Sequence, residues 1–514
     1  MKSKILGTTC ILTLAITSTA FASVNEDIKQ IGQPEHVSFI MKNIDISEDS
    51  SLVVDNEELT KLVSQYINKQ LTINDLNLLQ EKLTMFYRKS GYPAATAYLP
   101  KQDLTDGIVN IKVLSGKLDT VAVNNKSNIA NDILEDKVSV IKAGETTTKW
   151  DIDNLLYDLN SVNGIKATGS LASGTKSGTT SLKINVSGDK PYKGIIYTDN
   201  YGSKASGRYR LGTANSFYNF DGRGSDLSVG ALISNENMKD YFIDISTLTS
   251  PYQYRTKVGI NVDHSSYDLG GKYSAWGVNG NYTTYKLYGK TNAYKTMAHA
   301  LDYNYGVRVR DIQDKIDVVG LVSDKRSHAG YVGVSGYDRQ KNNLLSYDVA
   351  AVFGNHISNS ASPVNGSFVK FGGDVDYYHF LPSRWTFKSH NKFQLASKGL
   401  DSSEKMSVGG INGVRAYPSN ELSADYGIIS QTSFNYQTGM PNLSLGLFLD
   451  ASNVVDKYTG DSTSLFGYGA ELNYNKVDDF FIKLCYARRI GRYEFASNEA
   501  KAYGRFWFIA GKVL

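Results

Sequence analysis

Cysteine is scarce in this sequence, whose 514 residues contain only two, Cys10 and Cys485. Cys10 lies in an N-terminal segment that we expect to be removed, so the mature chain would keep a single thiol. A single thiol cannot form an intramolecular disulfide, and folding must rely on packing and hydrogen bonding. We interpret Cys485 as a structural residue of a strand.

Long apolar runs are also lacking after the N-terminus, which excludes membrane-spanning helices of about 18 or more residues. A strong charge of one sign is absent too. The formal net charge is +4, and it falls to +2 without residues 1–22, which hold two lysines and no acidic residue. Such near-neutrality argues against a nucleic-acid-binding protein.

Signatures of common catalytic and metal sites are missing. None of the seven histidines belongs to an H-E-x-x-H pattern. Neither a G-x-S-x-G elbow nor a phosphate-binding G-x-x-x-x-G-K-[ST] loop occurs. We therefore predict a protein that is not an enzyme and that needs neither a metal nor another cofactor.

The N-terminus has the pattern of a secretory signal. A pair of lysines precedes an apolar run at residues 5–16, and an Ala-Phe-Ala cleavage site follows at residues 20–22. The run is too short to cross a bilayer. We predict that residues 1–22 are a signal peptide and that residues 23–36 form a short N-terminal segment of the exported chain.

The next region, residues 37–188, combines helical and extended patterns. Apolar residues at helical spacing predict two amphipathic helices, with Thr72 and Asp75 as the cap of the second. Short alternating runs at residues 95–99 and 108–114 predict strands. The apolar positions of the two helices are Leu59, Leu62, Val63 and Tyr66, then Leu76, Leu79, Leu83, Phe86 and Tyr87.

A similar order returns further along the chain. Thr148 and Asp151 cap a helix, and a glycine-rich turn and a strand at residues 181–186 follow. We therefore predict two small α+β modules of β-α-α-β-β order, residues 37–118 and residues 119–188.

Beyond the second module the helical spacing disappears, and alternating runs are separated by Gly, Asn, Asp and Ser clusters. In residues 385–395 one face carries Trp, Phe and Leu, while Lys388, His390 and Lys392 share the other. A soluble sheet could not easily bury this polar row, but a water-filled lumen could accept it. The 35 tyrosines would suit interfacial girdles. We predict that residues 191–514 form a transmembrane barrel of about sixteen antiparallel strands, with the polar row in its lumen.

One arginine of this predicted barrel needs an explanation. Arg415 follows a glycine-rich turn, residues 409–413, within the tetrapeptide Val414-Arg415-Ala416-Tyr417. A cation inside a barrel needs a partner, since burying it alone costs several kcal/mol. Arg415 is therefore our first candidate for a functional residue.

Five segments carry a family resemblance: Tyr87–Ala94, Leu99–Leu104, Gly107–Ile111, Asp199–Gly202 and Gly222–Asp226. The first three match a pattern of the form Y-x-x-x-G-Y, L-P-x-Q-x-L and G-x-L-x-I-x-V. The fourth resembles D-N-x-G, and the fifth resembles a G-x-G-D turn. Together with the order of segments, these motifs resemble the TpsB family of two-partner secretion. Its members are outer-membrane transporters of haemolysins and adhesins, with POTRA modules before a barrel.

The resemblance implies roles for the arginine tetrapeptide. In the family a V-R-G-F/Y tetrad lies on a loop folded into the lumen, and its arginine pairs with the aspartate of an F-x-D-x-G strand motif. Phe448, Asp450 and Ser452 occupy that motif here, so Asp450 becomes the expected partner of Arg415. Ala416 and Ser452 replace family glycines, and a backbone that needed positive φ at Ala416 would be strained.

The resemblance also implies a function. A transporter of this kind recognises a partner exoprotein in the periplasm through its two modules and passes it, unfolded, through the barrel to the cell surface. The implied partners are a TpsA-like, β-helical exoprotein with an N-terminal secretion domain, outer-membrane lipid and the barrel-assembly machinery, with no nucleic acid. Two alternatives stay open: a factor that inserts other barrels into the outer membrane, and a solute porin, which has less need of periplasmic modules.

Overall fold

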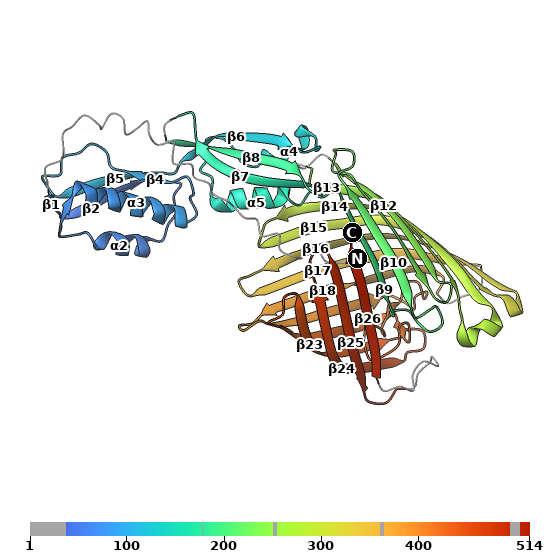
Figure 1. Cartoon of the computed structure of the whole chain (residues 1–514). Coiled ribbons are helices and arrows are strands. Elements are labelled where there is room, and N and C mark those ends of the chain that lie inside the picture. Colours follow the sequence, from blue (N-terminus) through green and yellow to red (C-terminus); the bar gives the residue numbers. More distant parts are fainter. Residues whose placement is uncertain (1–37, 177, 250–253, 360–363, 494–503) are drawn as a thin grey trace. The chain divides into compact units, whose positions relative to one another are not determined.

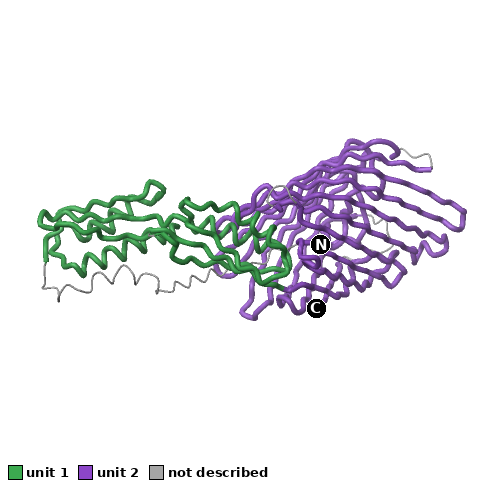
Figure 2. The backbone as a smooth tube through the Cα atoms, turned by 90° about the horizontal axis from the view of Figure 1, so that it is seen from above, with its two compact units in different colours: residues 1–189 green, residues 190–514 purple. Residues whose placement is uncertain are grey.

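The structure, a computed structural model, consists of two compact units, residues 1–189 and residues 190–514 (Figure 2). The predicted signal peptide and the N-terminal segment lie outside the described residues. No helix in the described part of the chain is long and apolar enough to span a membrane. The described residues are 38–176, 178–249, 254–359, 364–493 and 504–514.

The first module of unit 1 contains the predicted two helices and the strands that follow them, but β1 precedes β2 and β3 separates the helices, so its order is β-β-α-β-α-β-β (Figure 1). Its sheet has the order β2-β5-β4, with β2 parallel and β4 antiparallel to the central β5. A separate two-stranded sheet joins β1 to β3. The elements are β1 (Ser38–Met41), β2 (Asn43–Glu48), α2 (Asn56–Ser64), β3 (Lys69–Thr72), α3 (Ile73–Lys89), β4 (Thr96–Tyr98) and β5 (Ile108–Leu114).

Helix α3 supplies much of this module's core because its apolar residues recur at helical spacing. Leu76, Leu79 and Leu83 have no exposed surface. The helix begins with the predicted capping box, in which the Asp75 carboxylate accepts a hydrogen bond of 2.8 Å from the Thr72 amide. This hydrogen bond lowers the pKa of Asp75.

The second module has the predicted β-α-α-β-β order without additional strands, and its sheet is β6-β8-β7. The predicted capping box of Thr148 and Asp151 begins α5. The sequence patterns missed β6, α4 and β7, in part because α4 is eight residues long and has no side-chain cap. The predicted boundary at residues 118/119 falls inside β6, so the second module begins at Lys117. Its elements are β6 (Lys117–Lys126), α4 (Asn131–Val138), α5 (Lys149–Leu159), β7 (Ile165–Ser173) and β8 (Thr179–Gly188).

Unit 2 is a closed antiparallel barrel with 16 strands among its described residues, as the alternating pattern predicts (Figure 1). Strand β9 pairs with β10 on one side and with the last strand, β26, on the other, which closes the sheet. The strands are β9 (Tyr192–Asp199), β10 (Arg210–Tyr218), β11 (Asp226–Ser234), β12 (Lys239–Thr249), β13 (Thr256–Asp268), β14 (Val278–Lys295), β15 (His299–Ile316), β16 (Leu321–Arg339), β17 (Asn343–Ser358), β18 (Gly366–Phe380), β19 (Trp385–Ala396), β22 (Tyr426–Gln437), β23 (Leu443–Val455), β24 (Ser462–Asn475), β25 (Phe480–Ile490) and β26 (Gly504–Val513).

The two faces of the barrel wall differ in chemistry. On β23 the outward side chains of Leu447 and Leu449 are exposed, whereas Phe448 and Asp450 point inward and are buried. The exposed leucines suit contact with lipid. Strands β14 to β18 contain 15–19 residues each. A tilted strand needs roughly 9–11 residues to cross a bilayer, so these strands extend beyond the membrane.

The connection between β19 and β22, residues 397–425, is here called the lumen loop because its side chains contact inward-facing residues of the wall. It contains a two-stranded sheet of β20 (Met406–Ser407) and β21 (Ser423–Ala424). Its apolar residues join a buried cluster with side chains of β22 to β26. The loop is therefore packed against the wall and forms part of the folded barrel.

Candidate functional site

The tip of the lumen loop is the tetrapeptide that the sequence singled out. All four of its residues are buried, and Arg415 is only 5% exposed. A hydrogen bond from the Tyr417 amide to the Val414 carbonyl closes the turn. The tip therefore holds the charged side chain of Arg415 inside the barrel, where burial is unfavourable unless partners of opposite charge compensate it.

Asp450 of β23 is the main partner of Arg415. The guanidinium donates from Nη2 to Oδ1 at 2.6 Å and from Nε to Oδ2 at 2.9 Å, and the Arg415 amide donates to Oδ2 at 2.9 Å. Asp450 has no exposed surface. This two-pronged contact is geometrically specific, because only a planar guanidinium can match both carboxylate oxygens.

A second carboxylate completes the charge balance. Glu471 of β24 accepts a hydrogen bond of 3.0 Å from Nη1 of Arg415, and Lys483 of β25 lies 3.0 Å from the same carboxylate. The Arg415 guanidinium also lies 3.5 Å from the ring centre of Phe448. Two cations and two carboxylates thus form one cluster, in which Arg415, Asp450 and Glu471 are buried and Lys483 is partly exposed, with an aromatic face beneath the arginine.

The register of neighbouring strands explains why these residues meet. Gln431, Asp450 and Gly467 lie directly opposite one another on β22, β23 and β24, so these three positions share the inner face. Gln431 donates from Nε2 to the carbonyl oxygen of Gly413 at 2.6 Å. Trp507 of β26 donates from Nε1 to the carbonyl oxygen of Arg415 at 2.7 Å. Four strands therefore hold the tip.

Gly467 provides the space in which the tip docks. A Cβ added at Gly467 would lie 2.7 Å from the Cβ of Ala416, which is closer than such atoms normally approach. Ala416 itself is not among the non-glycine residues with positive φ. The strain expected from the missing family glycine is therefore absent, and the Ala416 side chain fills space left by a glycine on the wall.

Other residues predicted for the site have different surroundings. Ser452 lies one inward position beyond Asp450, and its buried hydroxyl has no hydrogen-bond partner in the described part of the chain. On β19, His390 pairs with Asp376 of β18 at 2.8 Å, and Lys388 lies over the ring of Tyr378. The partners of these two residues lie on β18, and within the ranges that the structure describes no ion pair or ring contact of Arg415 involves Lys388, His390 or Lys392 of β19.

Sequence reasoning missed several residues that hold the tip. Glu471 alternates with outward residues on β24, and Trp507 alternates with Phe506 and Phe508 on β26, so period-two patterning could have placed both inward. Their contact with Arg415 could not be read from the sequence, because it depends on how the loop folds back. Among the described residues, no group of three or more His, Cys, Asp or Glu is arranged to hold a metal.

Two family models match the chain. The model described as "POTRA domain, ShlB-type" matches residues 39–116, and the model described as "Haemolysin secretion/activation protein ShlB/FhaC/HecB" matches residues 178–474. The second match covers more than half of the chain, including the tip of the lumen loop and Asp450.

Two curated proteins are similar over most of the chain. Heme/hemopexin transporter protein HuxB of Haemophilus influenzae is 25% identical over 476 residues, which cover 88% of this chain and 84% of HuxB. Outer membrane transporter CdiB of Dickeya dadantii is 20% identical over 454 residues, which cover 83% of this chain and 78% of that CdiB.

Solved structures share the fold. CdiB from Escherichia coli matches with a TM-score of 0.66 and 17% identity, over 94% of this chain and 92% of that chain. BamA from Haemophilus ducreyi lacking POTRA domains 1–3 matches with a TM-score of 0.56 and 13% identity, over 93% of this chain and 100% of that chain.

The modules, the barrel and the docked lumen loop define an outer-membrane transporter with periplasmic POTRA domains. The chain belongs to the haemolysin secretion/activation protein family ShlB/FhaC/HecB, the TpsB transporters of two-partner secretion. Its function is the secretion of a partner exoprotein across the outer membrane.

Proposed function

We propose that the lumen loop closes the barrel at rest and that its release from Asp450 opens a path for the unfolded exoprotein. The observation that carries this proposal is the buried contact of Arg415 with Asp450, which fixes the loop tip to the wall by three hydrogen bonds. A chain in transit could pass this level of the lumen only after the tip moves.

The energetics of the contact favour a closed resting state. Removing one partner of a buried ion pair costs about 3–5 kcal/mol, because the other charge is left without compensation. Release of the tip would therefore be rare until other interactions replace those of Arg415. An entering polypeptide offers carbonyl and carboxylate oxygens that can serve as such replacements.

The proposed partners follow from the surfaces of the two units. Strand β7 is at the edge of its sheet, and an extended segment of the β-helical exoprotein would add to this edge in the periplasm. The apolar outer face of the barrel contacts lipid, and the barrel-assembly machinery inserts it. No nucleotide motif is present, so folding of the exoprotein outside the cell would supply the driving force.

Export and conductance of variants test the role of the loop. Arg415→Ala and Asp450→Ala are each expected to reduce export of the partner and to raise the resting conductance of the reconstituted protein. Arg326→Ala is the matched control, because Arg326 also pairs with an aspartate, Asp311, but both side chains are exposed. Its export should match that of the unchanged protein.

Normal export from correctly inserted Arg415→Ala and Asp450→Ala variants would refute the docking role. Deletion of the whole gene distinguishes the alternative function. Loss of many unrelated outer-membrane proteins, rather than of one exoprotein from the medium, would indicate a barrel-assembly factor.

A further inference from the structure

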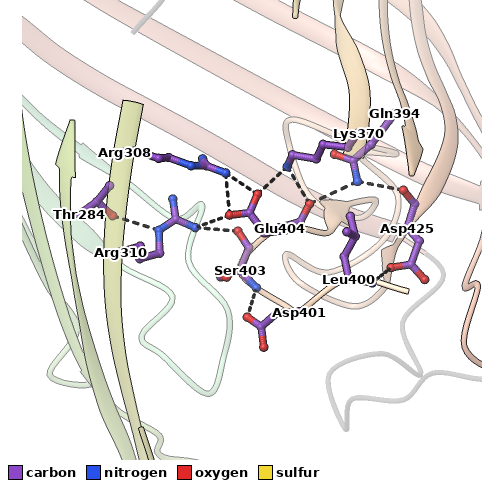
Figure 3. A network of polar contacts seen from close by, with 10 residues as sticks. All are labelled: Thr284, Arg308, Arg310, Lys370, Gln394, Leu400, Asp401, Ser403, Glu404 and Asp425. Carbon is purple, nitrogen blue, oxygen red and sulfur yellow. Dashed lines mark hydrogen bonds and ion pairs between the residues drawn. The ribbon is translucent and has the colours of Figure 1, made fainter. Parts of the chain in front are cut away.

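A second charged contact holds the lumen loop far from its tip. Glu404 lies before β20, and its side chain is 1% exposed. Arg308 donates from Nη2 to both of its carboxylate oxygens, and the ammonium nitrogen of Lys370 lies 2.8 Å from Oε2 (Figure 3). Arg310 lies 3.7 Å from Oε1.

The loop backbone takes part in the same contact. Lys370 donates to the carbonyl oxygen of Glu404 at 3.0 Å, and Arg310 donates to that of Ser403 at 2.8 Å (Figure 3). Gln394 donates to the carbonyl oxygens of Glu404 and Asp425, so it joins the two ends of the loop. The cations thus bind the backbone of a short turn, which the Glu404 amide closes by donating to the Asp401 carbonyl oxygen, together with the Glu404 carboxylate.

The two contacts of the loop have opposite polarity. At the tip, an arginine of the loop meets carboxylates on β23 and β24. Near β20, a carboxylate of the loop meets cations on β15 and β18. Asp401 adds to the second contact, since it lies 3.4 Å from Lys325 and 3.6 Å from His356. Only the first contact carries the family motif.

Three cations surround the single carboxylate of Glu404. Arg308, Arg310 and Lys370 form no ion pair with another carboxylate within the described ranges. Each is at most one-fifth exposed. If the loop withdraws, three partly buried cations lose their only paired carboxylate, which is costly unless another anion replaces it. An acidic residue of another polypeptide offers the same kinds of acceptor as Glu404, since it has a side-chain carboxylate and backbone carbonyl oxygens next to it.

We infer that Arg308, Arg310 and Lys370 form a carboxylate-binding site in the barrel wall, which Glu404 fills while the loop is docked. Its ligands after loop release are aspartate and glutamate side chains of the extended polypeptide in transit. This inference rests on the proposed movement of the loop. Acidic residues of the polypeptide would compete with Glu404 for the three cations. An acidic residue bound there would delay the return of the loop to its docked position.

Current block in planar bilayers tests the site without any exoprotein. The full-length protein is reconstituted, and a short oligoglutamate or oligolysine is added to both sides. In Glu404→Gln the cations lose their carboxylate and keep only neutral loop acceptors, so oligoglutamate should displace the segment more easily and block at a concentration about tenfold lower than in the unchanged protein. Oligolysine should show no such shift.

Two further variants locate the effect. Adding Arg308→Gln and Lys370→Gln to Glu404→Gln should abolish the tighter block. Adding Lys388→Gln should keep it, because that lysine lies on the lumen face of β19 and is stacked over Tyr378. Equal block in Glu404→Gln and in the triple variant, or no shift from the unchanged protein, would overturn the inference.

A conservative variant serves if Glu404→Gln inserts poorly, and the outcomes distinguish the carboxylate site from the Arg415 docking role. Glu404→Asp keeps the charge but shortens its reach, so it should shift the block in the same direction by a smaller factor. Failure of the block experiment would remove the carboxylate site and leave the Arg415 docking role intact. Normal export by Arg415→Ala together with the expected block would remove the docking role and keep the site.

Discussion

At the scale of single residues, the Arg415 cluster depends on the shape of the arginine as much as on its charge. The guanidinium reaches both oxygens of Asp450, one oxygen of Glu471 and the face of Phe448 at the same time. An ammonium group is compact and cannot make these contacts together. Charge alone would therefore not hold the loop tip.

Arg415→Lys tests this dependence. The variant keeps the positive charge but loses the two-pronged contact and the stacking on Phe448. We expect resting conductance between that of the unchanged protein and that of Arg415→Ala, with a loss of about 2 kcal/mol in docking free energy. Single-channel recordings measure the fraction of time spent open. A conductance equal to that of the unchanged protein would show that charge is sufficient.

Gly467→Ala tests the fit between tip and wall. The new Cβ would lie 2.7 Å from the Cβ of Ala416, so the tip must shift away from Asp450. We expect raised resting conductance and reduced export, at a cost of about 1–3 kcal/mol. Adding Ala416→Gly removes the clashing atom and should restore both properties. A double variant no better than Gly467→Ala would contradict this explanation.

At the scale of elements, the glutamine of the L-P-x-Q-x-L motif, Gln102, has a structural role in the first module. Gln102 donates from Nε2 to the carbonyl oxygen of Asn110 at 2.7 Å, and its Oε1 accepts from the Asn110 amide at 2.7 Å. The pairing of β4 with β5 covers only Leu114 to Lys112 on β5. The glutamine side chain therefore continues the ladder where the three-residue β4 has ended.

Gln102→Ala should loosen this edge of β5. Both backbone groups of Asn110 would lose their partner, and we expect local stability to fall by about 1–2 kcal/mol. Hydrogen exchange of the Asn110 amide in the full chain measures the change. Lys101→Ala is the control, because Lys101 is exposed and next in sequence. Equal exchange in the two variants would show that water replaces the glutamine without cost.

At the scale of the whole molecule, the two units have separate cores. The first module is built on its own apolar cluster, and the barrel closes through β9 and β26 within residues 190–514. Within the described ranges, the apolar cluster of the lumen loop is completed by residues of unit 2, namely side chains of β22 to β26 together with Tyr201 and Tyr493. The barrel fold should therefore not depend on the modules.

Deletion of residues 38–189 after the signal peptide tests this independence. The remaining barrel should insert and should keep the heat-dependent mobility on gels that folded barrels show. Export of the partner should be lost, because the periplasmic recognition surfaces are gone. The unchanged protein serves as the reference for both measurements. A truncated chain that fails to insert would mean that barrel folding requires the modules.

The fold was largely predictable because its signals are local. Helical spacing gave α2 and α3, the capping boxes at Thr72 and Thr148 gave two helix starts, and alternation gave the barrel. The elements β6, α4 and β7 were missed. Helix α4 has only eight residues and no side-chain cap, and a register shift between Leu118 and Thr120 interrupts the alternation of β6.

The sequence by itself determined the class of protein, the two α+β modules, the barrel and the candidate pair Arg415 and Asp450. Periodicity and motifs involve residues close together in sequence, so they can be recognised without knowledge of the tertiary structure. Only the tertiary structure decided that Arg415 also meets Glu471 and that Glu404 meets Arg308, 96 residues away in sequence. Such contacts depend on strand register and on the inward fold of the lumen loop, which no local pattern encodes.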